Sequence, residues 1–246
     1  MPFRTLKYGK QDHCAIIELA SPLSEPSSLA GELADVCSEI AWDEDARVVI
    51  LNFDGRELKS VRPESGLGES PAGSPVEEIA KLRQPVIAAI HGDCVDLGLE
   101  VAMAADLRIG EEGARFGLTQ IGQGLIPSGG GTQRLPRLIG MGKALEMVLT
   151  GELIGVEEAQ RAGLVQRVVP SGKVMEQALS LARAMSSHSP LSLSYVKEAL
   201  HHGLDLTLEQ GLRMEMDLYL LLFSTADRKE GLSSFQEKRK PQFKGE

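Results

Sequence analysis

Short runs of β-branched and apolar residues alternate with amphipathic stretches in the first hundred residues, and this alternation constrains the fold more than any other feature. The runs cover residues 13–19 (HCAIIEL), 47–53 (RVVILNF) and 85–91 (PVIAAIH), and they are typical of buried strands. Between them, residues 28–42 and 76–82 carry apolar side chains at helical spacing. The order strand, helix, strand, helix, strand predicts crossover units on a mainly parallel sheet covered by helices, which is an α/β fold.

The second half of the chain, from about Met141, has a different pattern that predicts helices and almost no strands. We expect helices over residues 143–150, 156–162, 173–187, 191–202, 206–223 and 227–240. The helix at 206–223 is apolar around most of its circumference, so it does not have one fully wet face. It is either buried within its own subunit or part of a subunit interface.

The charge balance and the cysteines exclude several classes of partner and location. The 246 residues include 26 Lys plus Arg against 35 Asp plus Glu, a net charge of −9, so we expect neither nucleic acid nor a membrane surface as a partner. Cys14, Cys37 and Cys94 are too scattered for a disulfide framework or a zinc site. We interpret them as free thiols in a reducing cytoplasm. No run of 18 apolar residues and no apolar signal core occur, which disfavours membrane spanning and secretion.

Glu100 is the only charged residue in the small and apolar stretch 97–105, which follows the third strand. A carboxylate is rarely buried unless it is paired or needed. Asp96 is a candidate N-cap, and its spacing from Glu100 places both carboxylates on one helix face, where they could act as acid and base. The alternative is that the helix dipole alone stabilises Glu100. The N–H groups of the turn that starts at Leu97 are suited to hold a developing oxyanion.

A glycine cluster at residues 129–131 opens into a further predicted helix. It is not a phosphate loop, because the nearest Gly-Lys pair, Gly142 and Lys143, is followed by alanine and lacks the leading glycine. No dinucleotide fingerprint G-x-G-x-x-G follows any of the strands. From the sequence we favour a close-packing turn over a functional site.

Four consecutive motifs between Gln84 and Val169 carry a family resemblance. They read QPVIAAIHG, GLEVAMAADLRIG, ARFGLTQIGQGLIPSGGGTQRLPRLIG and ALEMVLTGELIGVEEAQRAGLVQRVV. With the tail TADRKEGLSSFQEKRKPQFKG, they resemble the crotonase superfamily of enoyl-CoA hydratases and isomerases. The resemblance covers essentially the whole chain and is weakest in the first 75 residues or so. It implies a crotonase-like spiral of ββα repeats over residues 1–190, a C-terminal helical trimerisation and oligomerisation region over 191–246, and a homotrimer or a dimer of trimers (homohexamer).

The resemblance also implies roles for particular residues. Glu100 matches one of the two catalytic glutamates of the hydratases, whereas Gln120 stands where the family has the other. The backbone N–H of Leu97 matches one oxyanion donor, in a position that is usually glycine, and the first donor falls near Ser60. Asp96 is a candidate replacement carboxylate.

The acyl-CoA substrate needs local positive charge, since the chain as a whole is acidic. We expect Arg56, Lys59 and Arg62 to bind CoA, and the alternative for these side chains is that they are exposed, solvated charges. The resemblance implies no metal and no separate cofactor, because coenzyme A enters as part of the substrate.

The sequence thus predicts a cytoplasmic enoyl-CoA hydratase-like lyase of fatty acid metabolism that acts through an oxyanion-hole-stabilised enolate. A glutamine at position 120 can orient water but cannot exchange protons, and the loss of one general acid or base typically costs about 10²- to 10⁴-fold. Isomerases of the superfamily generally rely on this position, so isomerisation loses more support than hydration. The alternatives are a decarboxylase or isomerase of the same fold and a catalytically degenerate CoA-binding subunit.

Overall fold

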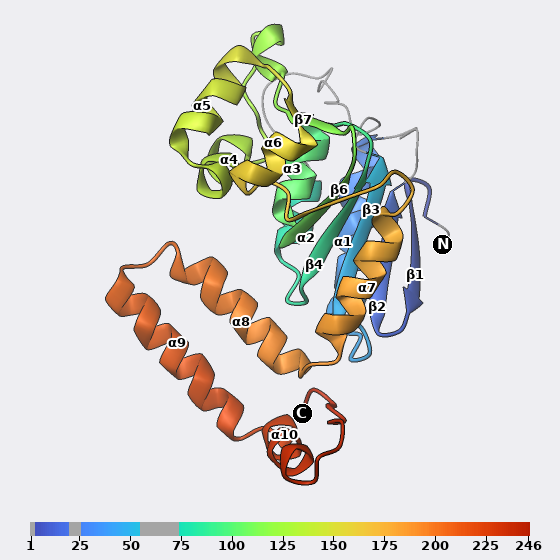
Figure 1. Cartoon of the computed structure of the whole chain (residues 1–246), viewed down its shortest axis with the longest axis vertical. Helices are drawn as coiled ribbons and strands as arrows, with labels where there is room; N and C mark the ends of the chain where they lie inside the picture. Colours follow the sequence, from blue (N-terminus) through green and yellow to red (C-terminus); the bar gives the residue numbers. More distant parts are fainter. Residues whose placement is uncertain (1–2, 20–25, 55–73) are drawn as a thin grey trace.

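A computed structural model describes residues 3–19, 26–54 and 74–246 (Figure 1). Its largest element is a six-stranded sheet with the order β1-β2-β3-β4-β6-β9. The strands are β1 (Leu6–Gln11), β2 (Cys14–Leu19), β3 (Val48–Asp54), β4 (Val86–His91), β6 (Leu107–Glu111) and β9 (Arg167–Val169). All neighbours are parallel except β1 and β2, which form an antiparallel hairpin. The expected α/β class is confirmed.

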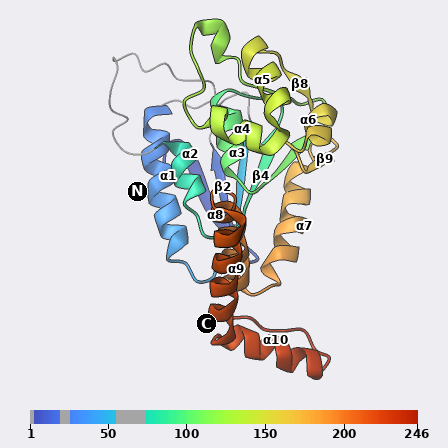
Figure 2. The same cartoon turned by 90° about the vertical axis from the view of Figure 1, so that its left-hand side faces the viewer.

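Helices cover both faces of this sheet because successive side chains of the buried strands point to opposite sides. In β3, Val49 and Leu51 pack in the same cluster as side chains of α1 (Pro26–Ala41) and α2 (Pro75–Ala80). Val48 and Ile50 pack in a second cluster with side chains of α7 (Val174–Ser186). Figure 2 shows α1 and α2 on one side of the sheet and α7 on the other.

A second, smaller unit of structure forms the end of the core at which the six-stranded sheet's parallel strands terminate. Its three-stranded sheet has the order β5-β7-β8. Its elements are β5 (Cys94–Val95), α3 (Leu97–Ala104), β7 (Arg115–Gly117), the 3-10 helix η1 (Gln120–Gln123), α4 (Gly131–Ile139), α5 (Met141–Thr150), β8 (Ile154–Gly155) and α6 (Val156–Ala162). β5 and β7 are parallel, so α3 and η1 begin close to each other.

The last three helices form an arm that extends away from the sheet (Figure 1). They are α8 (Pro190–Gly203), α9 (Leu208–Phe223) and α10 (Ala226–Gln236). α8 has no buried residue, and Leu218 is the only buried residue of α9. The interpretation that the apolar helix at 206–223 is buried within its own subunit is therefore wrong.

The predicted strands and helices are present, with ends that differ by a few residues. The expectation that strands nearly vanish beyond Met141 is confirmed, because that part of the chain forms only the two-residue β8 and the three-residue β9. β9 is an edge strand of the main sheet and pairs with β6. Its three residues carry too short a pattern to be recognised, and only the pairing defines them. The division of the chain into two domains at residue 190 stays a prediction. In the described ranges, no helix is long and apolar enough to span a bilayer.

Candidate active site

Helix α3 is buried from Gly98 to Ala104, and a side chain from outside the helix satisfies carbonyl groups at its C-terminal end. At its C-terminal end the buried Arg108 donates hydrogen bonds to the carbonyl oxygens of Ala105, at 2.6 Å, and Leu164, at 2.6 Å. Burial lowers the pKa of this guanidinium to about 10. Arg108 therefore satisfies carbonyl groups that a buried helix end would otherwise leave without partners.

Glu100 lies in the first half of α3, and its side chain is only 2% exposed. Its Oε1 accepts hydrogen bonds from the backbone N–H groups of Gly129, at 2.6 Å, and Gly131, at 2.9 Å. Oε2 accepts no hydrogen bond from the described residues. The explanation by the helix dipole alone is therefore insufficient, because amides of a distant segment hold the carboxylate. One oxygen is anchored, and the other remains available for chemistry.

The glycine cluster is both a close-packing turn and a part of this site. A Cβ atom on Gly129 would lie 3.0 Å from Glu100 Oε2 and 3.0 Å from Val76 Cγ2. On Gly131 it would lie 2.8 Å from the Cβ of Pro127 and 3.0 Å from Glu100 Oε1. The expectation of a close-packing turn is confirmed, and the same close approach lets the amides of Gly129 and Gly131 reach the Glu100 carboxylate.

The surroundings of Glu100 shift the ionisation of its carboxyl group. Burial raises the pKa of this carboxyl above its ordinary value, although the hydrogen bonds from Gly131 and Gly129 oppose the shift. The charge of Asp96 raises the pKa further, and that of Arg134 lowers it. A buried carboxyl whose pKa is raised keeps its proton more readily than a free one, which suits a group that acts as a general acid and base.

Asp96 occupies the N-cap position of α3, as predicted, but it does not cap the helix. Its φ is 54° and its ψ is −120°, and its side chain makes no hydrogen bond to the helix N-terminus. Instead Oδ1 accepts from the backbone N–H of Thr119 at 2.6 Å, and Oδ2 accepts from the Thr119 hydroxyl at 2.9 Å. The predicted N-cap position is confirmed, but the side chain does not cap the helix, because the backbone turn directs the carboxylate towards η1.

Leu97 and Gln120 each begin an element at this junction. Leu97 is the first residue of α3, where backbone N–H groups have no partner within the helix. Gln120 is the first residue of η1 and is 4% exposed. Its buried Oε1 accepts no hydrogen bond from the described residues. Because Asp96 precedes Leu97 and its carboxylate binds Thr119, the start of α3 and the start of η1 are joined.

The other predicted site residues lie outside the described residues. These are Ser60, the expected first oxyanion donor, and the expected CoA-binding residues Arg56, Lys59 and Arg62. Their roles stay predictions. No group of three His, Cys, Asp or Glu side chains in the described ranges is arranged to hold a metal ion, and the expectation that none is needed also stays a prediction.

Sequence reasoning missed two residues that shape the site. Thr119 binds Asp96, and Arg134 Nη1 donates to the carbonyl oxygen of Gly129 at 3.1 Å. Arg134 thus supports the turn whose amides hold Glu100. The glycine cluster was visible in the sequence, but no local pattern connects it with a glutamate 29 residues upstream.

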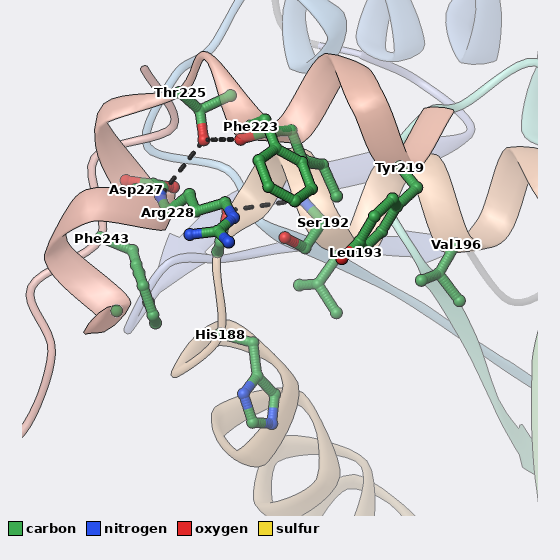
Figure 3. A pocket seen from close by; sticks show the side chains of 13 residues that line it. His188, Ser192, Leu193, Val196, Tyr219, Phe223, Thr225, Asp227, Arg228 and Phe243 are labelled. Carbon is green, nitrogen blue, oxygen red and sulfur yellow. Dashed lines mark hydrogen bonds between the residues drawn. The ribbon is translucent and has the colours of Figure 1, made fainter. Parts of the chain in front are cut away.

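A cavity of about 460 Å³ lies elsewhere, within the C-terminal arm (Figure 3). Aromatic and aliphatic side chains dominate its lining, including Val196, Tyr219 and Phe223. The guanidinium of Arg228 lies 4.1 Å from the centre of the Phe223 ring. Because neither Glu100 nor Gln120 lines this cavity, it is not part of the candidate active site.

Comparisons with known proteins agree on one family. The profile described as enoyl-CoA hydratase/isomerase matches residues 26–246. The 2,3-dehydroadipyl-CoA hydratase of Escherichia coli is 47% identical over 162 residues, which cover 66% of this chain and 64% of that protein. The (E)-benzylidenesuccinyl-CoA hydratase of Thauera aromatica is 37% identical over 250 residues, which cover 95% of this chain and 96% of that protein. The crystal structure of a Bacillus anthracis enoyl-CoA hydratase is 35% identical and superposes with a TM-score of 0.89 over 99% of this chain and 100% of that one.

Proposed function

Because this chain belongs to the enoyl-CoA hydratase/isomerase family, we propose that it adds water across the double bond of a 2-enoyl-CoA thioester. The crotonase superfamily resemblance and the mixed α/β crotonase fold are confirmed, and the family acts on acyl-CoA. The observation that carries the proposal is the burial of Glu100 and the anchoring of one of its carboxylate oxygens. This buried carboxyl is anchored through one oxygen by two glycine amides, beside a helix N-terminus whose cap residue leaves the N–H groups open.

The reaction requires an acceptor for the electron pair of the double bond and a group that moves a proton. Water attacks the β-carbon while Glu100 Oε2 takes one of its protons. The electrons of the double bond move into the thioester, where the N–H of Leu97 stabilises the enolate oxygen. Glu100 then returns the proton to the α-carbon, so that one carboxyl serves as base and as acid. Gln120 orients the water through its unpartnered Oε1 and exchanges no proton.

The alternative functions make different demands on the same residues. Decarboxylation of an acyl-CoA also passes through a thioester enolate, but the departing group is CO₂ and only one proton has to be supplied to carbon. A degenerate subunit would bind CoA thioesters without turnover. Glu100 is anchored through one oxygen, and burial raises its pKa above the ordinary value. Both features suit a reaction in which one carboxyl takes a proton and returns it.

A panel of thioesters tests this proposal. We expect the protein to hydrate crotonyl-CoA or 2,3-dehydroadipyl-CoA, measured as loss of the conjugated-enoyl absorbance, and Glu100→Gln to lose at least about 10²-fold in kcat. The exposed Glu112→Gln is the matched control and should not change the rate. Activity in the parent that survives Glu100→Gln would show that the site is wrongly assigned. Binding without turnover of any enoyl-, β-keto- or malonyl-type thioester would instead support the degenerate subunit.

We further propose that the chain acts as a homotrimer or a dimer of trimers in the cytoplasm. Large apolar side chains are exposed along the arm, among them Val196, Leu200, Leu208, Leu212, Met216, Tyr219, Leu220, Leu221 and Phe223. An apolar surface of this extent is an aggregation liability unless another subunit covers it. The three cysteines are free and buried, which suits a reducing compartment. Light scattering that gives a monomer at micromolar concentration would contradict the assembly.

A further inference from the structure

Asp96 has a backbone conformation that an aspartate rarely adopts. Its φ of 54° with a ψ of −120° lies in a region that glycine enters without steric cost. The other described non-glycine residues with positive φ are Asp12, His13 and Lys238, and all three are exposed. Asp96 is only 8% exposed. A strained conformation inside the protein persists only when the surrounding structure holds it.

The backbone of Asp96 joins the small sheet to α3. Its N–H donates to the carbonyl oxygen of Gly117 at 2.9 Å, and its own carbonyl accepts the N–H of Glu100 at 3.0 Å. The residue thus ends the β5–β7 pairing and begins the helix that carries Glu100. A change in its φ or ψ would rotate the peptide that follows, which carries the N–H of Leu97.

The side chain of Asp96 completes a clamp between two elements. Aspartate at an N-cap position usually accepts from the first helical N–H groups, but this carboxylate binds the backbone N–H and the hydroxyl of Thr119 instead. Thr119 immediately precedes Gln120. The result is that the N-terminal N–H groups of α3 are not occupied by the cap side chain, and the start of η1 is tied to them.

We propose that Asp96 is a positioning residue, which keeps the α3 N-terminus open for the substrate and fixes Gln120 relative to it. The statement that a thioester oxygen binds the open N–H groups rests on the proposed function. The statement that Asp96 fixes the position of η1 does not depend on it. This role differs from that of a replacement general acid or base, because both carboxylate oxygens are already engaged by Thr119. A positioning role needs a hydrogen-bond acceptor at this place, whereas proton transfer needs the titrating carboxyl.

Three substitutions separate these roles. Asp96→Gly removes the carboxylate and suits the backbone conformation, so we expect an unfolding temperature close to that of the parent and a kcat lower by about tenfold to hundredfold, as misplaced catalytic groups cause. Asp96→Asn retains an acceptor, so its kcat should fall less and the pH dependence of kcat should be unchanged. Thr119→Val removes the hydroxyl only and should give an intermediate loss. Asp12→Gly, at an exposed positive-φ aspartate, is the matched control and should keep the parent rate.

Two further readouts are independent of hydration. Hydrogen exchange of the segment 118–124 should be faster in Asp96→Gly than in the parent or in Asp12→Gly. Acetoacetyl-CoA, whose enolate absorbs when an oxyanion site stabilises it, should show less bound enolate in Asp96→Gly at equal occupancy.

Hydrogen exchange and kcat of the Asp96 variants test the positioning role separately from the proposed function. Unchanged exchange and unchanged kcat in Asp96→Gly would overturn the positioning role. A loss in Asp96→Asn as large as that in Glu100→Gln, with one limb of the pH profile missing, would also overturn it and make Asp96 a proton-transfer group. A parent protein that neither binds nor converts any thioester would refute the proposed function alone, and faster exchange of 118–124 would still support the clamp.

Discussion

Helices α3 and α9 are both rich in apolar residues, yet they meet their need for burial in different ways. α3 is buried along its length by other elements of its own chain, and its one charge, Glu100, has two hydrogen-bond donors. α9 extends into the arm and buries only Leu218 (Figure 1). The comparison shows that an apolar helix sequence predicts burial but does not predict which surface covers the helix. Other elements of the same chain cover α3, and we propose that a second copy of the chain covers α9.

The largest effect is expected from truncating matched leucines in the two helices. Leu99→Ala, at a position 0% exposed in α3, should lower the free energy of unfolding by about 2–5 kcal/mol because it leaves a cavity. Leu212→Ala, at a position 55% exposed in α9, should cost less than about 0.5 kcal/mol in dilute protein. Denaturant unfolding over a range of protein concentrations measures both.

The concentration series also tests whether α9 is covered. If subunits bury Leu212, its truncation should become more costly as the protein concentration rises, because association stabilises the folded state by mass action. If Leu212→Ala changes the free energy of unfolding by nearly zero at every protein concentration, no subunit covers α9, and the proposed contrast with α3 is wrong.

The next effect in size concerns the missing carboxylate near α3. On the hydratase proposal, Gln120→Glu adds a second proton-exchanging group and should raise kcat for crotonyl-CoA by about tenfold or more, and by coupling to Glu100 it should shift the pH profile of the reaction. If the site has been rebuilt around the amide for another reaction, the same change lowers the native activity and creates no hydration. Steady-state kinetics of Gln120→Glu beside Glu100→Gln and the parent decides between them.

A smaller effect is expected at the glycine turn that holds Glu100. Gly131→Ala places a Cβ 2.8 Å from the Cβ of Pro127 and 2.9 Å from Leu118 Cδ1, so neighbours have to move at a cost of about 1–3 kcal/mol. Gly142→Ala is the control, since its Cβ would meet nothing within 4 Å in the α5 helix, and it should stabilise by up to about 1 kcal/mol. Equal thermal stabilities of the two variants would contradict the close packing around Glu100.

The smallest effect concerns the attachment of the arm to the core. Asp106 accepts hydrogen bonds from His201 at 2.7 Å, from Lys197 at 2.8 Å and from the backbone of Val86 at 2.7 Å. Burial alone would raise the pKa of Asp106, but these partners hold it below its ordinary value. The hydrogen bond from His201 is the largest of the lowering causes. The contribution of Asp106 to stability is therefore present above the unfolded pKa of about 3.9 and is lost as the pH falls through the folded value.

Removing that carboxylate tests the attachment. Asp106→Asn should destabilise the protein at neutral pH by about 1–2 kcal/mol and should flatten the acid limb of stability below about pH 5. Urea titrations at several pH values measure this limb. A limb that is as steep in Asp106→Asn as in the parent would assign the acid sensitivity to other carboxyl groups.

The predictability of the elements followed the length of their patterns. The strands β2, β3 and β4 were predicted within a few residues because each has six or seven residues of mainly apolar character. β9, with three residues, exists because β6 offers it a partner. The hairpin strand β1 is largely polar and exposed, so its hydrogen bonds to β2 define it and its side chains do not.

The candidate site was only partly predictable for a related reason. Glu100 could be singled out because a lone charge in an apolar stretch is costly unless it has partners. The partners themselves, the amides of Gly129 and Gly131, approach through the packing of α3 against the glycine turn. Asp96 was correctly placed at the start of α3, but its hydrogen bonds depend on its positive φ, which no residue pattern predicts.

The amino-acid sequence by itself determined the α/β class, the family, the position of Glu100 and the glutamine at residue 120, because these depend on local periodicity, composition and motif identity. Only the tertiary structure decided that Asp96 binds Thr119 instead of capping its helix, that the glycine amides anchor one oxygen of Glu100, and that α9 is uncovered in the single chain. The physical reason is that hydrogen bonds and burial between distant segments depend on how closely their backbones approach. That approach follows from the packing of the whole chain and not from any one segment of it.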